Sequence, residues 1–295
     1  MPDAASPATM TSMTTTPSPE IGQTITAAGI ATNVHVHGDG VPVLLIHGSG
    51  PGVTAWANWR LTIPPLAGHF RVIAPDIVGF GFTERPDNVT YDLDTWTEHA
   101  LGVLDALGIE RAHVVGNSFG GSLALSLAIR HPERVDRLVL MGSVGVPFEI
   151  TPGLDAVWGY QPSPEAMLDL LHLFAYDASL TGPDLAQLRY EASVRPGVQE
   201  AFAAMFPAPR QRALDAMTHD LDSIRAIEAP TLIVHGRDDH VIPVENSLVL
   251  LHAIDNAQLH VFGRCGHWTQ IEHADEFADL VIRFLRSGPS ADAHE

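Results

Sequence analysis

The stretch AHVVGNSFGGSLALSLAIRHP, residues 112–132, decides the fold of this chain. It begins with a short apolar run, turns through GNSFG at residues 116–120, and continues into an alanine- and leucine-rich segment at residues 122–130 that favours a helix. The stretch therefore predicts a strand, a sharp turn and a helix. A serine in such a G-x-S-x-G turn is held in strained backbone geometry, and its hydroxyl projects into a cleft. Ser118 is thus a candidate reactive hydroxyl; the alternative is a glycine-rich turn with an incidental serine.

Apolar runs that predict strands alternate with helical stretches on both sides of this region. Residues 23–37 are typical of a hairpin with one wet face, and the continuous apolar run at residues 41–46 suits a strand covered on both faces. Asp94 is expected to cap a helix that runs to Leu107. The alternation predicts a mostly parallel α/β sheet of eight strands. The remaining strands are expected at residues 71–75, 112–117, 135–141, 230–235 and 258–262.

Residues 146–212 interrupt this alternation. They contain helical fragments separated by proline and glycine and no convincing strand, which predicts a helical lid inserted into the core. Met167, Leu170, Leu171 and Phe174 fall at helical spacing and form an apolar face, which either packs in the core or lines a pocket. The expected organisation is a core at residues 21–145 and 213–286, this lid, a disordered tail at residues 1–20 and a polar tail at residues 287–295.

The charge balance limits the classes of partner. The 295 residues include 16 Lys and Arg against 35 Asp and Glu, a formal charge of −19. This charge argues against a nucleic-acid or anionic-membrane surface, so an anionic ligand would need a local cationic pocket. No apolar run approaches the length of a membrane span, and residues 1–20 do not form a secretory signal. The 16 histidines show no metal-ligand spacing, so no metal and no cofactor is expected.

The single cysteine, Cys265, excludes an internal disulfide framework. It is interpreted as a small buried residue rather than a nucleophile. A chain with one cysteine and no leader fits the reducing cytoplasm best.

Three candidate catalytic loops each follow a predicted parallel strand. Ser118 follows the strand at residues 112–117, Asp238 and Asp239 follow a later strand, and His267 follows the last one. The carboxyl ends of parallel strands share one edge of the sheet, so the three loops can meet. A hydroxyl nucleophile needs a base to take its proton and an acid to hold that base in the right tautomer. The chain order of serine, acid and histidine is that of α/β-hydrolases.

A fourth loop, HGSGPG at residues 47–52, consists of small residues after the strand at residues 41–46. Its backbone amides can face a ligand, as an oxyanion hole requires; the alternative is a plain strand-to-helix turn. His47 is interpreted as a turn-stabilising residue rather than a base. Asp76, which follows the strand at residues 71–75, is likewise interpreted as fixing a turn.

Six motifs along residues 41–285 carry a family resemblance: HGSGPG with WANWR, GNSFGG, LRYEA, HGRDDHVIP and FGRCGHWTQIEH. With these motifs the chain resembles the meta-cleavage-product hydrolases, which cleave carbon–carbon bonds of ring-fission products in bacterial aromatic degradation. Such a set is far more specific than a lone G-x-S-x-G turn. The resemblance implies an α/β-hydrolase fold with an inserted helical lid, and a homo-oligomer.

By this resemblance Ser118 would be the nucleophile or polarising hydroxyl, His267 the base and Asp239 its acidic partner. Asp238 is the competing acid. Asp239 is favoured because the usual loop has glycine, two variable residues and then the acid, and Asp239 stands three residues after Gly236. The resemblance also implies two sets of binding groups, which are the oxyanion-hole amides of Ser49 and Phe119 and the dienoate-binding side chains of Asn58, Asn117, Arg189 and Trp268.

Two of these binding residues have alternatives. The planar guanidinium of Arg189 suits a substrate carboxylate, but the same residue could be a solvated arginine of the lid. The indole of Trp268 could bind substrate or simply pack the base in place.

The resemblance implies a two-stage reaction on 2-hydroxymuconic semialdehyde or 2-hydroxy-6-oxohepta-2,4-dienoate. The enol first becomes a keto form; water or Ser118 then adds to the remote carbonyl and the bond breaks, giving 2-hydroxypenta-2,4-dienoate and formate or acetate. The segment FAYD at residues 174–177 matches enzymes for these small acyl-side groups. The alternatives are larger alkyl or aryl groups, a general carboxylesterase, and a non-catalytic receptor on the same fold.

Overall fold

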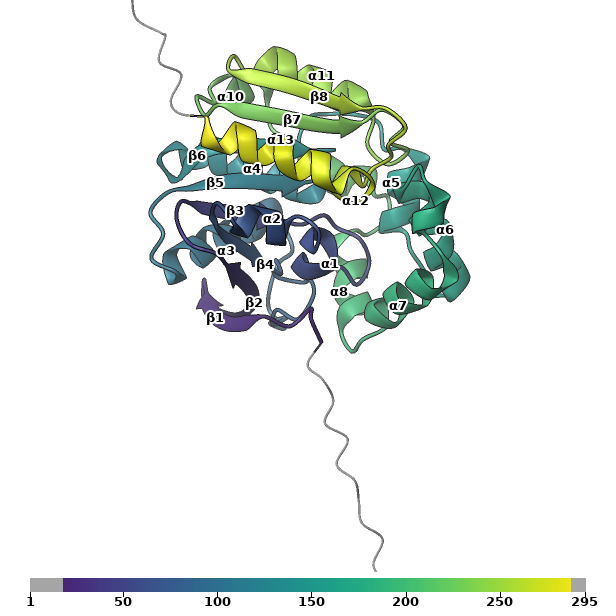
Figure 1. The fold of residues 1–295 in the computed structure, drawn as a ribbon. Coiled ribbons are helices and arrows are strands. Elements are labelled where there is room, and N and C mark those ends of the chain that lie inside the picture. The colour runs from purple at the N-terminus through teal and green to yellow at the C-terminus, as the bar shows by residue number, and fades with distance from the viewer. Residues whose placement is uncertain (1–17, 288–295) are drawn as a thin grey trace, which may run out of the picture.

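An eight-stranded sheet runs through the protein, and the computed structural model describes it within residues 18–287 (Figure 1). The strand order is β1-β2-β4-β3-β5-β6-β7-β8. β1 and β2 form an antiparallel hairpin, β2 is antiparallel to β4, and all other neighbours are parallel. The mostly parallel eight-stranded sheet expected from the sequence is confirmed. The strands are β1 (Gln23–Ala27), β2 (Ile30–His37), β3 (Pro42–Ile46), β4 (Arg71–Pro75), β5 (Ala112–Asn117), β6 (Val135–Met141), β7 (Thr231–Gly236) and β8 (Ala257–Phe262).

Helices cover both faces of the sheet because alternate strand residues are apolar on each side. In β3, Val43 and Leu45 belong to one buried cluster and Leu44 and Ile46 to the other. The first cluster packs under α1, α2 and α13, and Figure 1 shows α2 and α13 over that face. These helices are α1 (Ala55–Trp59), α2 (Ile63–Ala67) and α13 (Ala274–Arg286); the helices of the other face are α3 (Leu93–Ala106), α4 (Phe119–Arg130), α10 (Leu221–Arg225) and α11 (Val244–Ala253).

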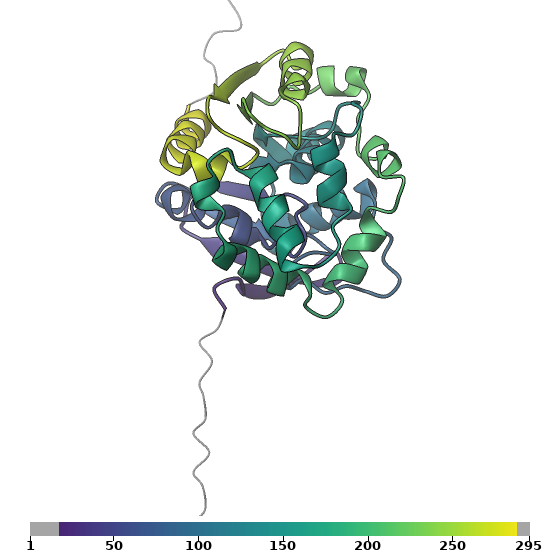
Figure 2. The same ribbon diagram turned by 90° about the vertical axis from the view of Figure 1, so that its right-hand side faces the viewer.

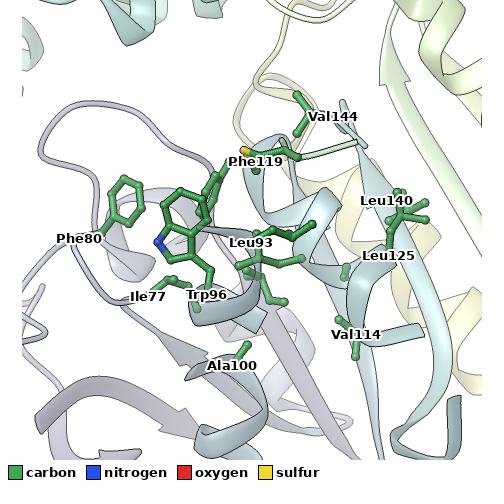
Figure 3. Close-up of a cluster of buried hydrophobic side chains, with 14 of the residues drawn as sticks. Ile77, Phe80, Leu93, Trp96, Ala100, Val114, Phe119, Leu125, Leu140 and Val144 are labelled. Atoms are coloured by element: carbon green, nitrogen blue, oxygen red, sulfur yellow. The ribbon is translucent and has the colours of Figure 1, made fainter. Parts of the chain in front are cut away.

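An aromatic cluster under α3 and α4 fixes the start of α4 (Figure 3). The ring of Phe119 meets Trp96 edge-on at a centroid distance of 4.8 Å and lies 5.3 Å from the ring of Phe80. Such pairs stabilise by about 0.5–1.5 kcal/mol beyond the burial of their area. Phe119 directly follows Ser118, so this packing holds the turn that presents the serine.

The segment between β6 and β7 is helical and contains no strand among its described residues. Figures 1 and 2 show its helices at the end of the sheet toward which β7 and β8 point. Proline occupies the first turn of α5, α6 and α7, where its missing N–H has no helical partner in any case. The helices are α5 (Pro152–Trp158), α6 (Pro164–Phe174), α7 (Pro183–Ser193), α8 (Val198–Met205) and α9 (Gln211–Asp215), and we call residues 146–212 the inserted segment.

One helix boundary differs from the expectation. Asp92, not Asp94, caps α3, because its side chain accepts a hydrogen bond from the Thr95 amide at 2.8 Å. Asp94 lies in the first turn instead and pairs with Arg130. Near the C-terminus, His273 separates the short helix α12 (Thr269–Glu272) from α13.

The two expected tails lie mostly outside the described residues. Of the tail expected at residues 1–20, residues 1–17 are outside, whereas Ser18, Pro19 and Glu20 are ordered against the core and line a cavity, so the expected disorder is wrong for these three. Of the tail expected at residues 287–295, only Ser287 is described. Over residues 18–287 no helix is long and apolar enough to cross a membrane.

Candidate active site

Ser118 occupies a strained turn between β5 and α4. Its φ of +53° and ψ of −113° lie outside the backbone conformations that residues other than glycine ordinarily adopt. The Ser118 amide donates to Met141 O at 2.8 Å, which ties the turn to β6. Glycine is required on either side, because a Cβ atom on Gly116 would lie 2.4 Å from Gly120 O, and one on Gly120 would lie 2.4 Å from Ile46 O. The backbone therefore holds the Ser118 side chain in the wall of a cavity.

The side chains of Asp239 and His267 are paired. His267 Nδ1 lies 2.7 Å from Asp239 Oδ2, and Asp239 Oδ1 accepts from the amides of Val241 and Ile242 at 2.7 and 2.9 Å. Burial disfavours the charged carboxylate, but the rings of His267 and His235 outweigh this effect and hold the pKa of Asp239 below its ordinary value. An ionised Asp239 keeps the His267 proton on Nδ1 and leaves Nε2 free to act as a base.

The two neighbouring aspartates have different surroundings. The Asp238 side chain is 27% exposed and pairs with Arg237 at 3.1 Å, whereas the Asp239 side chain is 1% exposed. A second buried ring also faces Asp239, since His235 Nε2 lies 3.4 Å from its Oδ2. His235 was not among the predicted site residues, although it opens the same HGRDD loop. This geometry favours Asp239 over Asp238 as the partner of the base.

The loop after β3 presents backbone at the same cavity. His47 Nδ1 donates to Gly48 O at 2.7 Å, and its Nε2 accepts from the Ile77 amide at 3.0 Å. The C=O and N–H of a planar trans peptide point in opposite directions, so this bond turns the Ser49 amide away from His47. Burial lowers the pKa of His47 to about 4, which keeps the ring neutral. The turn-stabilising interpretation of His47 is therefore confirmed.

A cavity of about 370 Å³ brings the predicted site residues together. Asp239 stands behind His267, and Phe119 is the first residue of α4, where a backbone amide has no helical partner. Met167, Leu171 and Phe174 of α6 also line the cavity, so the apolar face of this helix both packs in the core and forms the cavity wall. The predicted residues that line the cavity are Ser49, Asn58, Asn117, Ser118, Arg189, His267 and Trp268.

Two buried side-chain atoms of this cavity have no hydrogen-bond partner within residues 18–287, namely Asn58 Nδ2 and Gln270 Oε1. The rest of each amide is engaged, since Asn58 Oδ1 accepts from the Gly48 amide at 3.2 Å and Gln270 Nε2 donates to Asn58 O at 3.4 Å. Buried polar groups are normally paired, so this unpaired donor and acceptor indicate a polar ligand. Gln270 was not predicted, although it stands three residues after His267.

Arg189 and Trp268 both line the cavity and also contact neighbouring residues of its wall. The Arg189 side chain is only 12% exposed, donates to Glu20 Oε1 at 2.8 Å and also to Gly52 O. It is therefore not a solvated arginine. The Trp268 ring stacks on Phe174 at a centroid distance of 5.0 Å, and the Trp268 amide donates to Phe174 O. This indole thus lines the cavity and packs the histidine loop at the same time.

Asp76 and Cys265 are buried and do not belong to the Asp239–His267 pair. Asp76 accepts from the amides of Ala55 and Phe82 at 2.6 and 2.8 Å, which confirms that it fixes loops. Burial raises the pKa of Asp76 to about 6. Burial, with the nearby charge of Glu272, raises the pKa of the Cys265 thiol, so this cysteine stays protonated and is a poor nucleophile.

Glu272 joins the histidine loop to the inserted segment. Its Oε1 accepts from the Gly266 amide at 2.7 Å, and its Oε2 accepts from the amides of Tyr176 and Asp177 at 2.7 and 3.0 Å. Gly266 directly precedes His267, so the Glu272 carboxylate fixes the loop that carries His267. Sequence reasoning missed Glu272; its only local signal is its place at the end of the FGRCGHWTQIEH motif.

Glu272→Gln should loosen this joint, because an amide offers one acceptor oxygen where the carboxylate uses two. We expect the free energy of unfolding to fall by roughly 1–3 kcal/mol and kcat to fall by roughly tenfold. Glu276→Gln is the matched control, since Glu276 is 70% exposed and pairs only with His273 among the described residues. Chemical denaturation and steady-state kinetics measure both effects. Equal stability and equal kcat in the two variants would contradict the assigned contact.

Comparisons with known proteins agree in fold and in sequence. A sequence profile of the alpha/beta hydrolase fold matches residues 41–274. The 2-hydroxymuconate semialdehyde hydrolase of Pseudomonas sp. (strain CF600) is 62% identical over 93% of this chain and 97% of its own length. The 2-hydroxy-6-oxo-2,4-heptadienoate hydrolase of Pseudomonas putida is 60% identical over 90% of this chain and 96% of its own.

A solved structure is similar in three dimensions. It is that of a serine-to-alanine mutant of the meta-cleavage product hydrolase CumD from Pseudomonas fluorescens, complexed with acetates. The TM-score is 0.90 at 60% identity, over 90% of this chain and 98% of that one.

Proposed function

We propose a function from the premise that this chain belongs to the α/β-hydrolase fold family and within it to the meta-cleavage-product hydrolases. The protein hydrolyses the carbon–carbon bond of a 2-hydroxy-6-oxo-2,4-dienoate formed by ring fission. The products are 2-hydroxypenta-2,4-dienoate and a small carboxylic acid. One observation carries the proposal: a single cavity is lined by the Ser118 hydroxyl, the His267 ring and the Arg189 guanidinium. These groups suit a carbonyl at one end of the substrate and a carboxylate at the other.

His267 moves protons in both stages of the reaction. In the first stage, a proton is removed from the enol hydroxyl and a proton is added to the carbon beside the remote carbonyl, which gives the keto form. In the second, Ser118 or a water molecule adds to that carbonyl, and the amides of Ser49 and Phe119 stabilise the resulting oxyanion by about 3–4 kcal/mol each. The carbon–carbon bond then breaks, and its electron pair leaves with the five-carbon fragment. One water is consumed: its hydroxyl ends in the small acid and its proton in the dienoate.

The carboxylate end of the substrate binds at the cationic part of the cavity. Arg60 and Arg189 both line it, which provides local positive charge in a protein of formal charge −19. The unpaired Asn58 Nδ2 donates to a substrate oxygen, and the unpaired Gln270 Oε1 accepts from the enol hydroxyl. Each of these polar atoms would cost free energy if it stayed buried without a partner.

Loss of the colour of a ring-fission product tests the reaction directly. Purified protein should bleach 2-hydroxymuconic semialdehyde, with one equivalent each of formate and 2-hydroxypenta-2,4-dienoate formed. A general carboxylesterase would hydrolyse simple esters and leave the dienoate unchanged, and a non-catalytic receptor would do neither. No bleaching at saturating protein would refute the proposed function.

The acyl side of the preferred substrate is small. The cavity of about 370 Å³ is near the lower end of the roughly 300–1,000 Å³ range of small-molecule sites, and the relatives at 60–62% identity are named for hydrogen or methyl acyl groups. An added methylene changes such selectivity by about 10–200-fold, while the flexible Met167 allows some adaptation. We expect kcat/KM to fall in the order hydrogen or methyl, isopropyl, phenyl. A preference for phenyl would show the substrate assignment to be wrong.

The inserted segment acts as a lid over this site, and the core comprises residues 21–145 and 213–286. Two contacts between lid and core support this role, since Trp158 Nε1 donates to Ser49 Oγ at 2.9 Å and Arg189 donates to Gly52 O. The resemblance of the motifs further supports a homo-oligomer that works in the cytoplasm, in the catabolism of aromatic compounds.

A further inference from the structure

The carboxylate of Glu20 lies against the guanidinium assigned to the substrate carboxylate. Glu20 Oε1 is 2.8 Å from Arg189 Nη1, and Glu20 Oε2 is 3.6 Å from Arg195 Nη1. The Arg189 and Glu20 side chains are only 12% and 16% exposed. Glu20 and Arg189 line the same cavity, so this ion pair forms part of its wall.

The backbone of Glu20 is fixed to the core. Its carbonyl accepts from Asn33 Nδ2 at 3.0 Å and from His35 Nε2 at 3.2 Å, and both donors belong to β2. The Gly22 amide donates to Asn33 Oδ1 at 2.8 Å. Glu20 therefore reaches from an anchored segment of the core to a helix of the lid, and Figure 1 shows this segment emerging from β1 near α7. A residue held in this way is poorly suited to move aside for a ligand.

The guanidinium of Arg189 keeps donors for a ligand. Arginine has five N–H donors in a planar fork; Glu20 and Gly52 O each take at least one. Arg60 lies close enough to influence the same groups, since burial and then the charge of Arg189 lower the pKa of Arg60, while Glu20 opposes that change. The carboxylate of Glu20 faces two guanidinium groups, those of Arg189 and Arg195, and Arg60 lines the same cavity, so the cluster keeps a surplus of positive charge for an anion.

We propose that Glu20 is a positioning residue that holds Arg189 in place for the carboxylate of the substrate, an inference that rests on the proposed function. Two contacts, to Glu20 and to Gly52 O, fix the orientation of the guanidinium before the ligand arrives. A donor that is already fixed loses less conformational freedom on binding. Glu20 also separates the charges of Arg189 and Arg195, which otherwise repel each other.

The competing interpretation of Glu20 predicts the opposite effect on the affinity for a carboxylate ligand. If Glu20 instead occupied the place of the substrate carboxylate, its removal would free Arg189 and strengthen anion binding. The two roles therefore predict changes of opposite sign in the dissociation constant of a carboxylate ligand.

Calorimetry with sorbate, an unreactive dienoate carboxylate, measures that constant on the full-length protein. We expect Glu20→Gln and Glu20→Ala to raise the Kd of sorbate by roughly tenfold. They should raise KM for the ring-fission product by a similar factor and leave kcat within about twofold. Asp155→Asn is the matched control, because it removes an ion pair within the lid, to Arg210 at 3.2 Å, that does not line the cavity. It should leave both constants unchanged.

A double-mutant cycle assigns the effect to Arg189. In an Arg189→Gln background, Glu20→Gln should cause no further loss of sorbate affinity, because the pair is already broken. Tighter or unchanged sorbate binding in a folded Glu20→Gln protein would overturn the inference, as would full additivity in the cycle. Failure of the proposed function would be distinct: the wild-type protein would not bleach the ring-fission product, whatever the Glu20 variants did to sorbate binding.

Discussion

Ser118→Ala should lower kcat for the ring-fission product by at least roughly a thousandfold, with about 10⁶-fold as the upper range found when a serine protease loses its nucleophile. The reason is that the proposed reaction uses the Ser118 hydroxyl in the chemical step, where it either attacks the carbonyl or polarises water. In the proposed function the carboxylate of the substrate binds at Arg189, which the substitution leaves intact, so the substrate Kd should stay within about twofold. Single-turnover bleaching measures the rate, and sorbate titration measures the retained binding site.

Ser126→Ala is the matched control for this substitution. Ser126 lies in α4, the helix that follows Ser118, is fully buried, and its hydroxyl has no hydrogen-bond partner among the described residues. Its loss should leave kcat unchanged, because the residue does not line the cavity. A Ser118→Ala protein with a rate near that of wild type would refute the assignment of Ser118.

Asp239→Asn should reduce kcat by roughly 10⁴-fold, the loss seen when the triad acid of another serine hydrolase becomes an amide. If the new amide oxygen faces the Val241 and Ile242 amides, its NH₂ group faces His267 Nδ1. Nδ1 must then accept, so the ring proton moves to Nε2. A ring protonated there cannot take the proton of Ser118 or of water. If the amide is reversed, two backbone amides lose their acceptor and the fold is destabilised instead.

Asp238→Asn should change kcat by no more than about twofold, because its carboxylate is part of a partly exposed pair with Arg237. The two variants differ by one position in the same loop, so each controls for general disturbance by the other. Steady-state kinetics with a parallel measurement of Tm separates a loss of chemistry from a loss of folding. A larger loss in Asp238→Asn than in Asp239→Asn would move the acid by one residue.

Much of the protein follows from the sequence alone. The apolar runs determine the strands, because alternate residues must be buried on both faces of a parallel sheet; β4 and β6 occupy the expected residues 71–75 and 135–141. The G-x-S-x-G turn determines the strained serine, since Gly116 and Gly120 leave no room for a Cβ atom. The order of the serine, aspartate and histidine loops follows from the same pattern, because parallel strands end at one edge.

Local rules were less reliable where two residues offer the same chemistry. Asp92 and Asp94 can both cap a helix, and only the backbone geometry of Asp92 allows its side chain to reach the Thr95 amide. Asp238 and Asp239 can both pair with a histidine, and the burial of Asp239 between two rings distinguishes them.

Only the tertiary structure decided which distant groups complete the site. The Glu20–Arg189 pair joins residues 169 positions apart, and the Tyr176–Glu272 hydrogen bond joins residues 96 positions apart. No periodicity or local motif connects such residues, because both operate over a few neighbouring positions along the chain. Folding brings residues 18–20, the inserted segment and the histidine loop to one edge of the sheet. A buried charge needs a partner, so the contacts made on folding fix the positions of Arg189 and His267. The sequence could identify these residues only as candidates.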